Sequence, residues 1–221
     1  MTEPGSGATP RRRRGVPTLL AITDLRTLRR PVTEWLDELV DAGVDAVQIR
    51  EKHLDDRASF ELARTVAEHV GERLTVLVNG RVDVALAAGC HGVHLPADSV
   101  PVAAIRARFG PSLLIGRSTH NLDEVRRASE GGADYVTFGP VYATPSKEAY
   151  GPPPGLAGLE SAVSQSPAVL ALGGVEPSRL GDVRAAGARG VAGIRAFQDA
   201  GSLVEMALAG RRLWPIEERT A

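Results

Sequence analysis

The chain contains little cysteine, few aromatic residues, almost no net charge and no long apolar run. Cys90 is the single cysteine among 221 residues, which excludes an intramolecular disulfide and a cysteine-based metal site. The formal net charge of −1 gives no electrostatic reason to expect nucleic acid or membrane as a partner. No stretch approaches the apolar length of a transmembrane helix. We therefore expect a cytoplasmic protein.

The first residues lack an apolar face with helical or strand periodicity. Residues 1–16 contain Gly, Pro and Ser, followed by four arginines at residues 11–14. This composition predicts a disordered basic tail over residues 1–16, ahead of one domain over residues 17–221. A signal peptide is the alternative, but its apolar part at residues 19–22 is too short.

The remaining sequence alternates short apolar runs with helical patterns. The runs are not alternately polar and apolar, as expected for parallel strands that are buried on both faces. Eight strand–helix units favour a closed, single-domain (β/α)8 TIM barrel over a doubly wound open sheet. The expected strands are residues 18–23, 46–50, 74–78, 92–95, 113–115, 135–138, 168–172 and 191–194.

The polar residues that follow these strands should converge at one mouth of such a barrel. Each of them alone is most simply a solvated loop residue, but together their cations, hydroxyls and amides suit a small anionic ligand. The residues concerned are Gln48, Arg50, Lys52, Asn79, His94, Ser118, His120, Thr144, Ser146, Lys147, Gly173, Gly174 and Arg195.

Glycines after the last two strands predict a phosphate site. Gly173 and Gly174 follow the seventh strand, and Gly193 and Ile194 precede Arg195 at the end of the eighth. Glycine lets backbone N–H groups approach an anion, and phosphate commonly binds at these two loops of a TIM barrel. A Gly-Gly pair alone more often marks only a turn.

His120 is the strongest candidate for proton transfer. It ends the segment of residues 115–120, which we interpret as a strand end and a loop before a helix. Its position opposite the phosphate site favours general acid/base work over a solvent-facing role. We interpret His94 as structural, and expect His53, His69 and His91 at the surface.

Three motifs resemble the thiamine phosphate synthase superfamily, from about residue 18 to the last helix. They are Gln48-Ile-Arg-Glu-Lys52, the loop of residues 138–147, and the Gly-Gly segment of residues 171–175. The resemblance implies a TIM barrel in thiamine biosynthesis that binds a phosphorylated thiazole, with no nucleic-acid or membrane partner. The sequence leaves open whether the chain forms a homo-oligomer.

The superfamily has two branches, and the chain carries features of both. The synthase branch joins a pyrimidine diphosphate to a thiazole phosphate, and two aspartates serve its magnesium ion. Gly80 and Ser99 stand at those positions here, whereas Gln48 and Lys52 keep the synthase residues. The tautomerase branch resembles residues 78–83, 94–96, 105–109 and 116–120. Arg195 stands where both branches usually carry Ser.

From this resemblance we expect a thiazole tautomerase, an isomerase without metal or other cofactor. His120 would move the proton that makes a carboxythiazole phosphate aromatic. The ring and its carboxylate would be oriented by Ser118, Asn79 and Arg50, and the phosphate would be held by Gly173, Gly174, Gly193 and Ile194. The alternatives are a magnesium-dependent thiamine phosphate synthase, which is a transferase, and a non-catalytic regulator that binds thiazole phosphates.

Overall fold

A computed structural model describes residues 14–144, 152–166 and 168–215 of the chain. Eight parallel strands close into a barrel, because β8 pairs with β1 as well as with β7. The strands are β1 (Leu19–Ile22), β2 (Ala46–Ile49), β3 (Thr75–Asn79), β4 (Gly92–Leu95), β5 (Leu114–Thr119), β6 (Tyr135–Phe138), β7 (Val169–Leu172) and β8 (Gly190–Gly193). The predicted TIM-barrel fold is confirmed.

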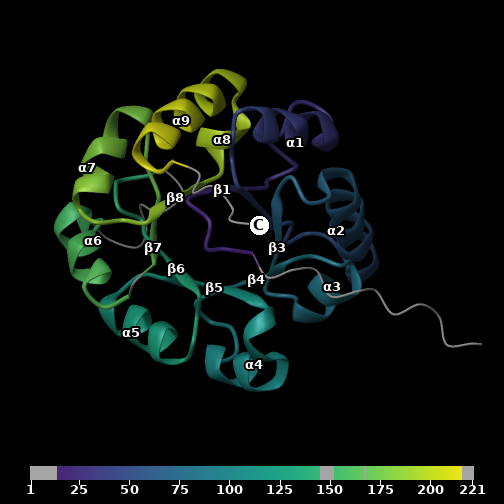
Figure 1. The fold of residues 1–221 in the computed structure, drawn as a ribbon, viewed down its shortest axis with the longest axis horizontal. Helices are drawn as coiled ribbons and strands as arrows, with labels where there is room; N and C mark the ends of the chain where they lie inside the picture. Colours follow the sequence, from purple (N-terminus) through teal and green to yellow (C-terminus); the bar gives the residue numbers. More distant parts are fainter. Residues whose placement is uncertain (1–13, 145–151, 167, 216–221) are drawn as a thin grey trace, which may run out of the picture.

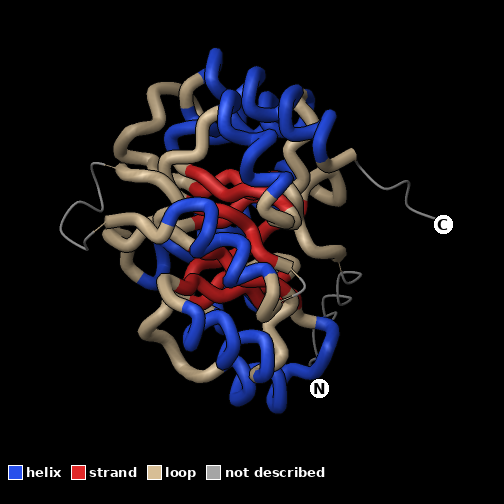
Figure 2. Tube along the Cα trace, turned by 90° about the vertical axis from the view of Figure 1, so that its left-hand side faces the viewer, coloured by secondary structure: helices blue, strands red, loops and turns tan. Residues whose placement is uncertain are grey.

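Helices surround the barrel on its outside (Figure 1). In the side view of Figure 2, the strands lie in the middle of the molecule with helices on either side. The helices are α1 (Val32–Asp41), α2 (Asp56–Val70), α3 (Val82–Ala87), α4 (Val102–Phe109), α5 (Leu122–Glu130), α6 (Gly155–Val163), α7 (Leu180–Ala185), α8 (Arg195–Gln198) and α9 (Ala200–Leu213), with the 3-10 turns η1 (Gly110–Ser112) and η3 (Pro177–Arg179).

Side-chain caps fix the start of three of these helices. The side chains of Asp55, Asn121 and Asp199 accept backbone N–H groups at the N-termini of α2, α5 and α9. Each cap satisfies a donor that the first helical turn leaves free. The caps of α2 and α5 follow the segments that leave β2 and β5, so they also fix where the chain leaves the mouth of the barrel.

The strands divide the buried side chains into two layers. Outward-facing residues such as Val47, Val76 and Val93 pack under the helices. Inward-facing residues such as Leu20, Leu77 and Leu170 fill the barrel interior. This alternation decides which polar residues can reach the mouth, because successive side chains of a strand point to opposite faces.

Two details differ from the sequence-based predictions. Strand β5 extends to Thr119, whereas we expected a loop from Gly116 onward. The four-residue helix α8 between β8 and α9 was not predicted, since so short a segment has no measurable periodicity.

The N-terminal end of the barrel holds residues that we expected in solvent. Arg14, in the predicted tail, is buried and pairs with the Glu72 side chain, so at least the end of that tail is packed. Residues 1–13 lie outside the described part of the chain. His91 is also buried, and its Nδ1 accepts the Val76 N–H at 3.0 Å, so the predicted surface position is wrong.

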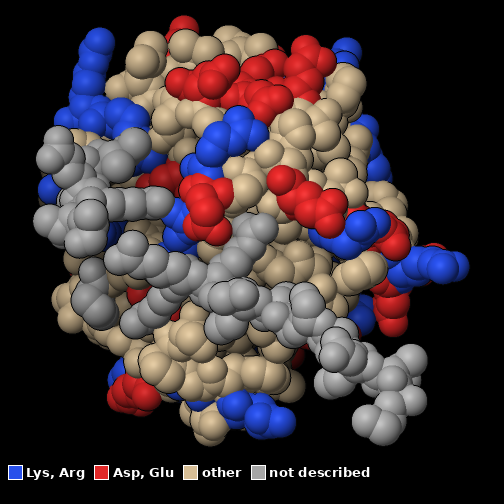
Figure 3. Space-filling view, turned by 45° about the vertical axis from the view of Figure 1, so that its right-hand side comes forward, with Lys and Arg blue, Asp and Glu red and all other residues tan. Residues whose placement is uncertain are grey.

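The surface carries mixed charge. Figure 3 shows basic and acidic side chains close together over much of one face, with acidic side chains gathered along its upper edge. No helix among the described residues is long and apolar enough to cross a membrane.

Candidate active site

Polar side chains replace the apolar filling at the C-terminal end of the barrel interior. Gln48 is the next-to-last residue of β2, Asn79 ends β3, and the Gln48 Nε2 donates to the Asn79 Oδ1 at 2.9 Å. Gln48 is only 2% exposed, and its Oε1 has no hydrogen-bond partner among the described residues. This amide pair forms one side of the mouth, and both residues were predicted there.

His94 lies beside Asn79 on the neighbouring strand β4 and points into the barrel. Its Nδ1 is 3.0 Å from the Tyr135 hydroxyl, its Nε2 is 2.9 Å from the Ser118 Oγ, and Thr137 Oγ1 lies 3.4 Å from Nε2. Burial lowers the pKa of His94 to about 3, and the positive charges of Arg117 and Arg50 act in the same direction. The imidazole is therefore neutral at physiological pH.

Gly116 makes the contact between His94 and Tyr135 possible. The strand register places Gly116 beside His94 on one side and Tyr135 on the other. A Cβ atom at Gly116 would lie 2.2 Å from Tyr135 Cζ and 2.6 Å from His94 Nδ1. Because the glycine leaves this space open, side chains from β4 and β6 meet across β5.

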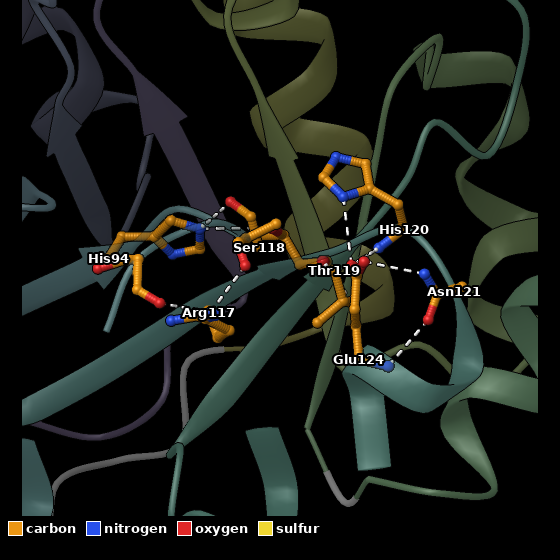
Figure 4. A network of polar contacts seen from close by, with 10 residues as sticks. His94, Arg117, Ser118, Thr119, His120, Asn121 and Glu124 are labelled. Atoms are coloured by element: carbon orange, nitrogen blue, oxygen red, sulfur yellow. Dashed lines mark hydrogen bonds and ion pairs between the residues drawn. The ribbon is translucent and has the colours of Figure 1, made fainter. Parts of the chain in front are cut away.

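His120 stands apart from this buried group. Its side chain is 42% exposed, and its Nδ1 lies 3.3 Å from Glu124 Oε2. The His120 backbone N–H donates to the same carboxylate oxygen at 2.7 Å. Figure 4 shows the ring directed toward Glu124, while His94 and Ser118 face each other. The structure therefore attaches His120 to the first turn of α5, and its proton-transfer role stays a prediction.

Arg117 points outward and holds the loop between β4 and α4. Its guanidinium donates to the carbonyl oxygens of Ala97 at 2.8 Å, Ser99 at 3.1 Å and Val100 at 2.8 Å. Partial burial lowers the pKa of Arg117. The side chain that precedes Ser118 thus fixes the neighbouring loop, while Ser118 itself faces the mouth.

One predicted cation, Lys52, lies at a cavity near the mouth. This cavity of about 210 Å³ adjoins the ends of β2 and β3, and it is lined by Glu51, Lys52, Ser59, Asn79 and Arg81 among others. Lys52 is exposed there. Arg81 pairs with Asp56 and Asp83, so its charge is already balanced. Arg50 directly follows β2 and is half-buried, and its backbone N–H donates to Thr23 Oγ1 at 2.8 Å.

The loop after β7 has the backbone that its glycines predict. Gly173 and Gly174 have φ angles of +94° and +65°, which side-chain-bearing residues rarely adopt. A Cβ at Gly174 would lie 2.8 Å from Tyr142 Cβ, so close packing also requires this glycine. Arg179 stacks over the Tyr142 ring at 4.4 Å and donates to the Gly174 carbonyl at 2.8 Å. This loop is rigidly supported.

The other predicted phosphate ligands are distributed as follows. Gly193 ends β8 and Ile194 follows it, and both are half-buried, while Arg195 is exposed at the start of α8. Thr144 is buried. Ser146 and Lys147 lie outside the described residues. The structure thus gathers Gln48, Asn79 and Ser118 in the barrel mouth, with the two glycine loops at the ends of β7 and β8.

Tyr135 and Thr137 were not among the predicted site residues, and His94 was predicted to be structural. The alternation of inward-facing and outward-facing side chains along the strands could have identified them. His94 on β4, Ser118 on β5 and Thr137 on β6 all occupy inward-facing positions near strand ends. Comparing these positions between neighbouring strands predicts that the three side chains lie close together.

Comparisons with known proteins extend over most of the chain. The family model described as thiamine monophosphate synthase matches residues 19–197. A thiamine-phosphate synthase of Moorella thermoacetica is 37% identical over 193 residues, 86% of this chain and 90% of that protein. One of Anaeromyxobacter dehalogenans is 42% identical over 158 residues, 71% of each.

A solved structure agrees in fold and in sequence. The thiamine phosphate pyrophosphorylase from Pyrococcus furiosus has a TM-score of 0.77 and 31% identity, covering 89% of this chain and 94% of its own.

The names of these relatives contradict the tautomerase prediction. That prediction rested on Gly80, Ser99 and the segment of residues 116–120, yet similar proteins over most of the chain are named synthases. The prediction gave a few positions more weight than the similarity over the whole sequence. On the match over residues 19–197 and on these relatives, the chain belongs to the thiamine monophosphate synthase family.

Proposed function

We propose that the protein is a thiamine-phosphate synthase, a transferase that joins a pyrimidine diphosphate to a thiazole phosphate. The observation that carries this proposal is the 37% identity to the Moorella thermoacetica synthase over 90% of that protein. The synthase-type residues Gln48 and Lys52 support it, because both lie at the barrel mouth or its adjoining cavity.

The arrangement of polar groups suits this reaction. A bond forms between the thiazole nitrogen and the pyrimidine methylene carbon, and the bond from that carbon to the diphosphate breaks. Negative charge develops on the departing diphosphate, so fixed donors and cations at the mouth lower the barrier. Arg50 and Lys52 supply charge on the β2 side, and Gln48 and Asn79 supply amide groups.

The thiazole phosphate fits the opposite side. The loops after β7 and β8 place Gly173, Gly174 and Ile194 at the usual phosphate position of this fold, with Gly193 as the last residue of β8, and we assign the phosphate to their backbone N–H groups. Ser118, between the two sides, can donate its hydroxyl to either substrate. In this arrangement two anionic groups bind at separate ends of one mouth.

The described residues do not fit a magnesium site built on two aspartates. Gly80 has no donor side chain, and the Ser99 carbonyl accepts from Arg117. Asp83 pairs with Arg81, and Asp98 is exposed. Among the described residues, no group of three or more His, Cys, Asp or Glu side chains could hold a metal ion. We therefore assign charge neutralisation to the cations of the chain itself.

A coupled assay tests the proposal. Purified protein is mixed with hydroxymethylpyrimidine diphosphate and thiazole phosphate, and pyrophosphate and thiamine phosphate are both quantified, with and without magnesium. We expect equal amounts of the two products, and none when the thiazole phosphate is omitted. Lys52→Ala should slow the reaction, whereas Arg57→Ala, a nearby exposed cation on α2, should not. Absence of both products under every condition would contradict the proposal.

A further inference from the structure

The buried group around His94 determines where its protons lie. Tyr135 is fully buried, and among the described residues its hydroxyl has one hydrogen-bond neighbour, His94 Nδ1 at 3.0 Å. Burial raises the pKa of Tyr135, so the hydroxyl keeps its proton. That proton needs an acceptor inside the barrel.

Only one tautomer of neutral His94 supplies this acceptor. If Nδ1 carried the imidazole proton, it would donate to the Tyr135 oxygen and leave the phenolic proton without an acceptor among the described residues. A buried unsatisfied donor costs about 1–3 kcal/mol. With Nδ1 bare, Tyr135 donates to it, and Nε2 carries the proton of the neutral ring.

The proton on Nε2 then decides the role of Ser118. Nε2 lies 2.9 Å from Ser118 Oγ and 3.4 Å from Thr137 Oγ1, so the N–H donates mainly to Ser118. Because Ser118 Oγ accepts this bond, its own proton is free to point elsewhere. Ser118 is half-buried at the mouth, whereas the rest of the chain of hydrogen bonds is buried.

We propose that Tyr135 and His94 are positioning residues that fix Ser118 as a hydrogen-bond donor toward the bound substrate. The proton order runs from the Tyr135 hydroxyl to Nδ1, and from Nε2–H to Ser118 Oγ. The Ser118 hydroxyl then donates a hydrogen bond to an acceptor on the substrate. This direction favours an anionic oxygen at that position and disfavours a group that is itself a donor. The substrate part of this inference rests on the proposed function, whereas the proton order does not.

Nuclear magnetic resonance of the full chain, labelled with ¹⁵N-histidine, tests the proton order without substrate. The signals of His94 are assigned by their loss in His94→Gln. We expect a bare Nδ1 and a protonated Nε2 from about pH 5 to about pH 8. Tyr135→Phe should shift the tautomer toward a mixture. An Nδ1–H tautomer in the unmodified protein would overturn the proposal, whatever the enzyme does with substrates.

A double-mutant cycle tests the consequence for catalysis. Tyr135→Phe should lower kcat/KM for coupling by about tenfold when Ser118 is present, and have little effect in a Ser118→Ala background. Additive losses would show that Tyr135 acts only on stability and would overturn the positioning role. If no coupling activity is found, the cycle is run on the binding of inorganic pyrophosphate, with the same expectation.

Thr119→Val is the matched control. Thr119 is equally buried and donates its hydroxyl to the Thr137 carbonyl at 2.9 Å, but it faces the helices rather than the mouth. Its replacement removes a buried hydroxyl from the same strand at nearly constant volume. The His94 tautomer should stay unchanged, and the loss should be additive with Ser118→Ala. Coupling of Thr119→Val to Ser118 as strong as that of Tyr135→Phe would contradict the proposed path.

Discussion

At the residue scale, Gly116 is the position on which the buried group around His94 depends. It has no side chain where the register would otherwise place one between His94 and Tyr135. The gap is filled by the two rings, whose centroids are 5.5 Å apart. A glycine in mid-strand usually weakens a strand, so its presence here has a packing reason.

Gly116→Ala should therefore be destabilising. The added methyl would overlap the Tyr135 ring, and overpacking of this kind costs about 1–3 kcal/mol. Urea unfolding should show a lower midpoint, with a parallel fall in kcat/KM. The control is Gly181→Ala in α7, where a Cβ meets no atom within 4 Å and should be neutral or stabilising. Equal midpoints for the two variants would contradict this explanation.

The pKa of His94 gives the stability of the protein a pH dependence. Unfolded His94 takes up a proton near its ordinary value of 6.5, whereas the folded residue does so only near 3. Between these two pH values, unfolding is therefore accompanied by uptake of a proton. The contribution of neutral His94 to the free energy of unfolding is full above pH 6.5 and is lost as the pH falls. The slope is at most about 1.4 kcal/mol per pH unit.

His94→Gln should flatten this slope between about pH 4 and about pH 6. The free energy of unfolding is measured by urea titration at each pH for the protein and the variant. His53→Gln serves as the control, because the His53 side chain is 43% exposed. An unchanged slope in His94→Gln would mean that other titratable groups, and not His94, cause the pH dependence.

At the scale of single elements, strand order and strand character were predictable, but strand ends were not. Buried apolar runs gave all eight strands, since a parallel barrel needs apolar residues on both faces. The end of β5 was missed because Gly116, Arg117 and Ser118 are typical of loops. They belong to the strand because side chains of the neighbouring strands pack into the space at Gly116 and form hydrogen bonds with Ser118.

The site was predictable to a similar degree. Gln48, Asn79 and Ser118 follow apolar runs, and the structure places them at the mouth. The position of the His120 ring depends on Glu124, four residues later on α5, and a pattern of strand ends does not contain this contact. The pairing of His94 with Tyr135 joins residues 41 positions apart, so no local pattern contains it.

Two loops give a prediction about magnesium. Gly80 and Ser99 lie after β3 and β4, where a pair of carboxylates would raise the local affinity for a hard cation. Magnesium should not change the rate of pyrophosphate release by the unmodified protein, whereas Gly80→Asp combined with Ser99→Asp should make that rate rise with magnesium concentration. Gly80→Asn combined with Ser99→Asn has the same size without the charge, and its rate should not respond to magnesium. An equal response in both variants would assign the effect to loop conformation.

At the scale of the whole molecule, helix α9 is bound to the N-terminal end of the barrel. Arg211 on α9 donates to the Gly43 carbonyl at 2.6 Å and to Thr18 Oγ1 at 2.7 Å, and it pairs with Asp45 at 3.1 Å. Asp45 in turn accepts the Leu19 N–H at 2.9 Å. This network connects the end of the described chain to its first two strands.

Arg211→Ala should lower global stability by about 1–3 kcal/mol, because it leaves Asp45 and three other acceptors, among them the Trp214 carbonyl, without their charged partner. Thermal unfolding should remain a single transition at lower Tm, and the KM values should not change, since the network lies at the end of the barrel opposite the mouth. Arg212→Ala is the control, because Arg212 is exposed. A shift in Tm for Arg212→Ala of the same size would contradict the proposed contribution of the network.

The two-sidedness of β5 limits how this sequence can diverge. Gly116 and Ser118 face the barrel interior and its mouth, whereas Arg117 and Thr119 point outward and bind a loop and a neighbouring strand. A deletion or insertion of one residue would exchange the two sets, since side-chain direction alternates along a strand. The guanidinium would then enter a space that a glycine now leaves open beside a neutral imidazole. Homologues can therefore vary β5 by substitution, but changes in its length should be confined to the loops on either side.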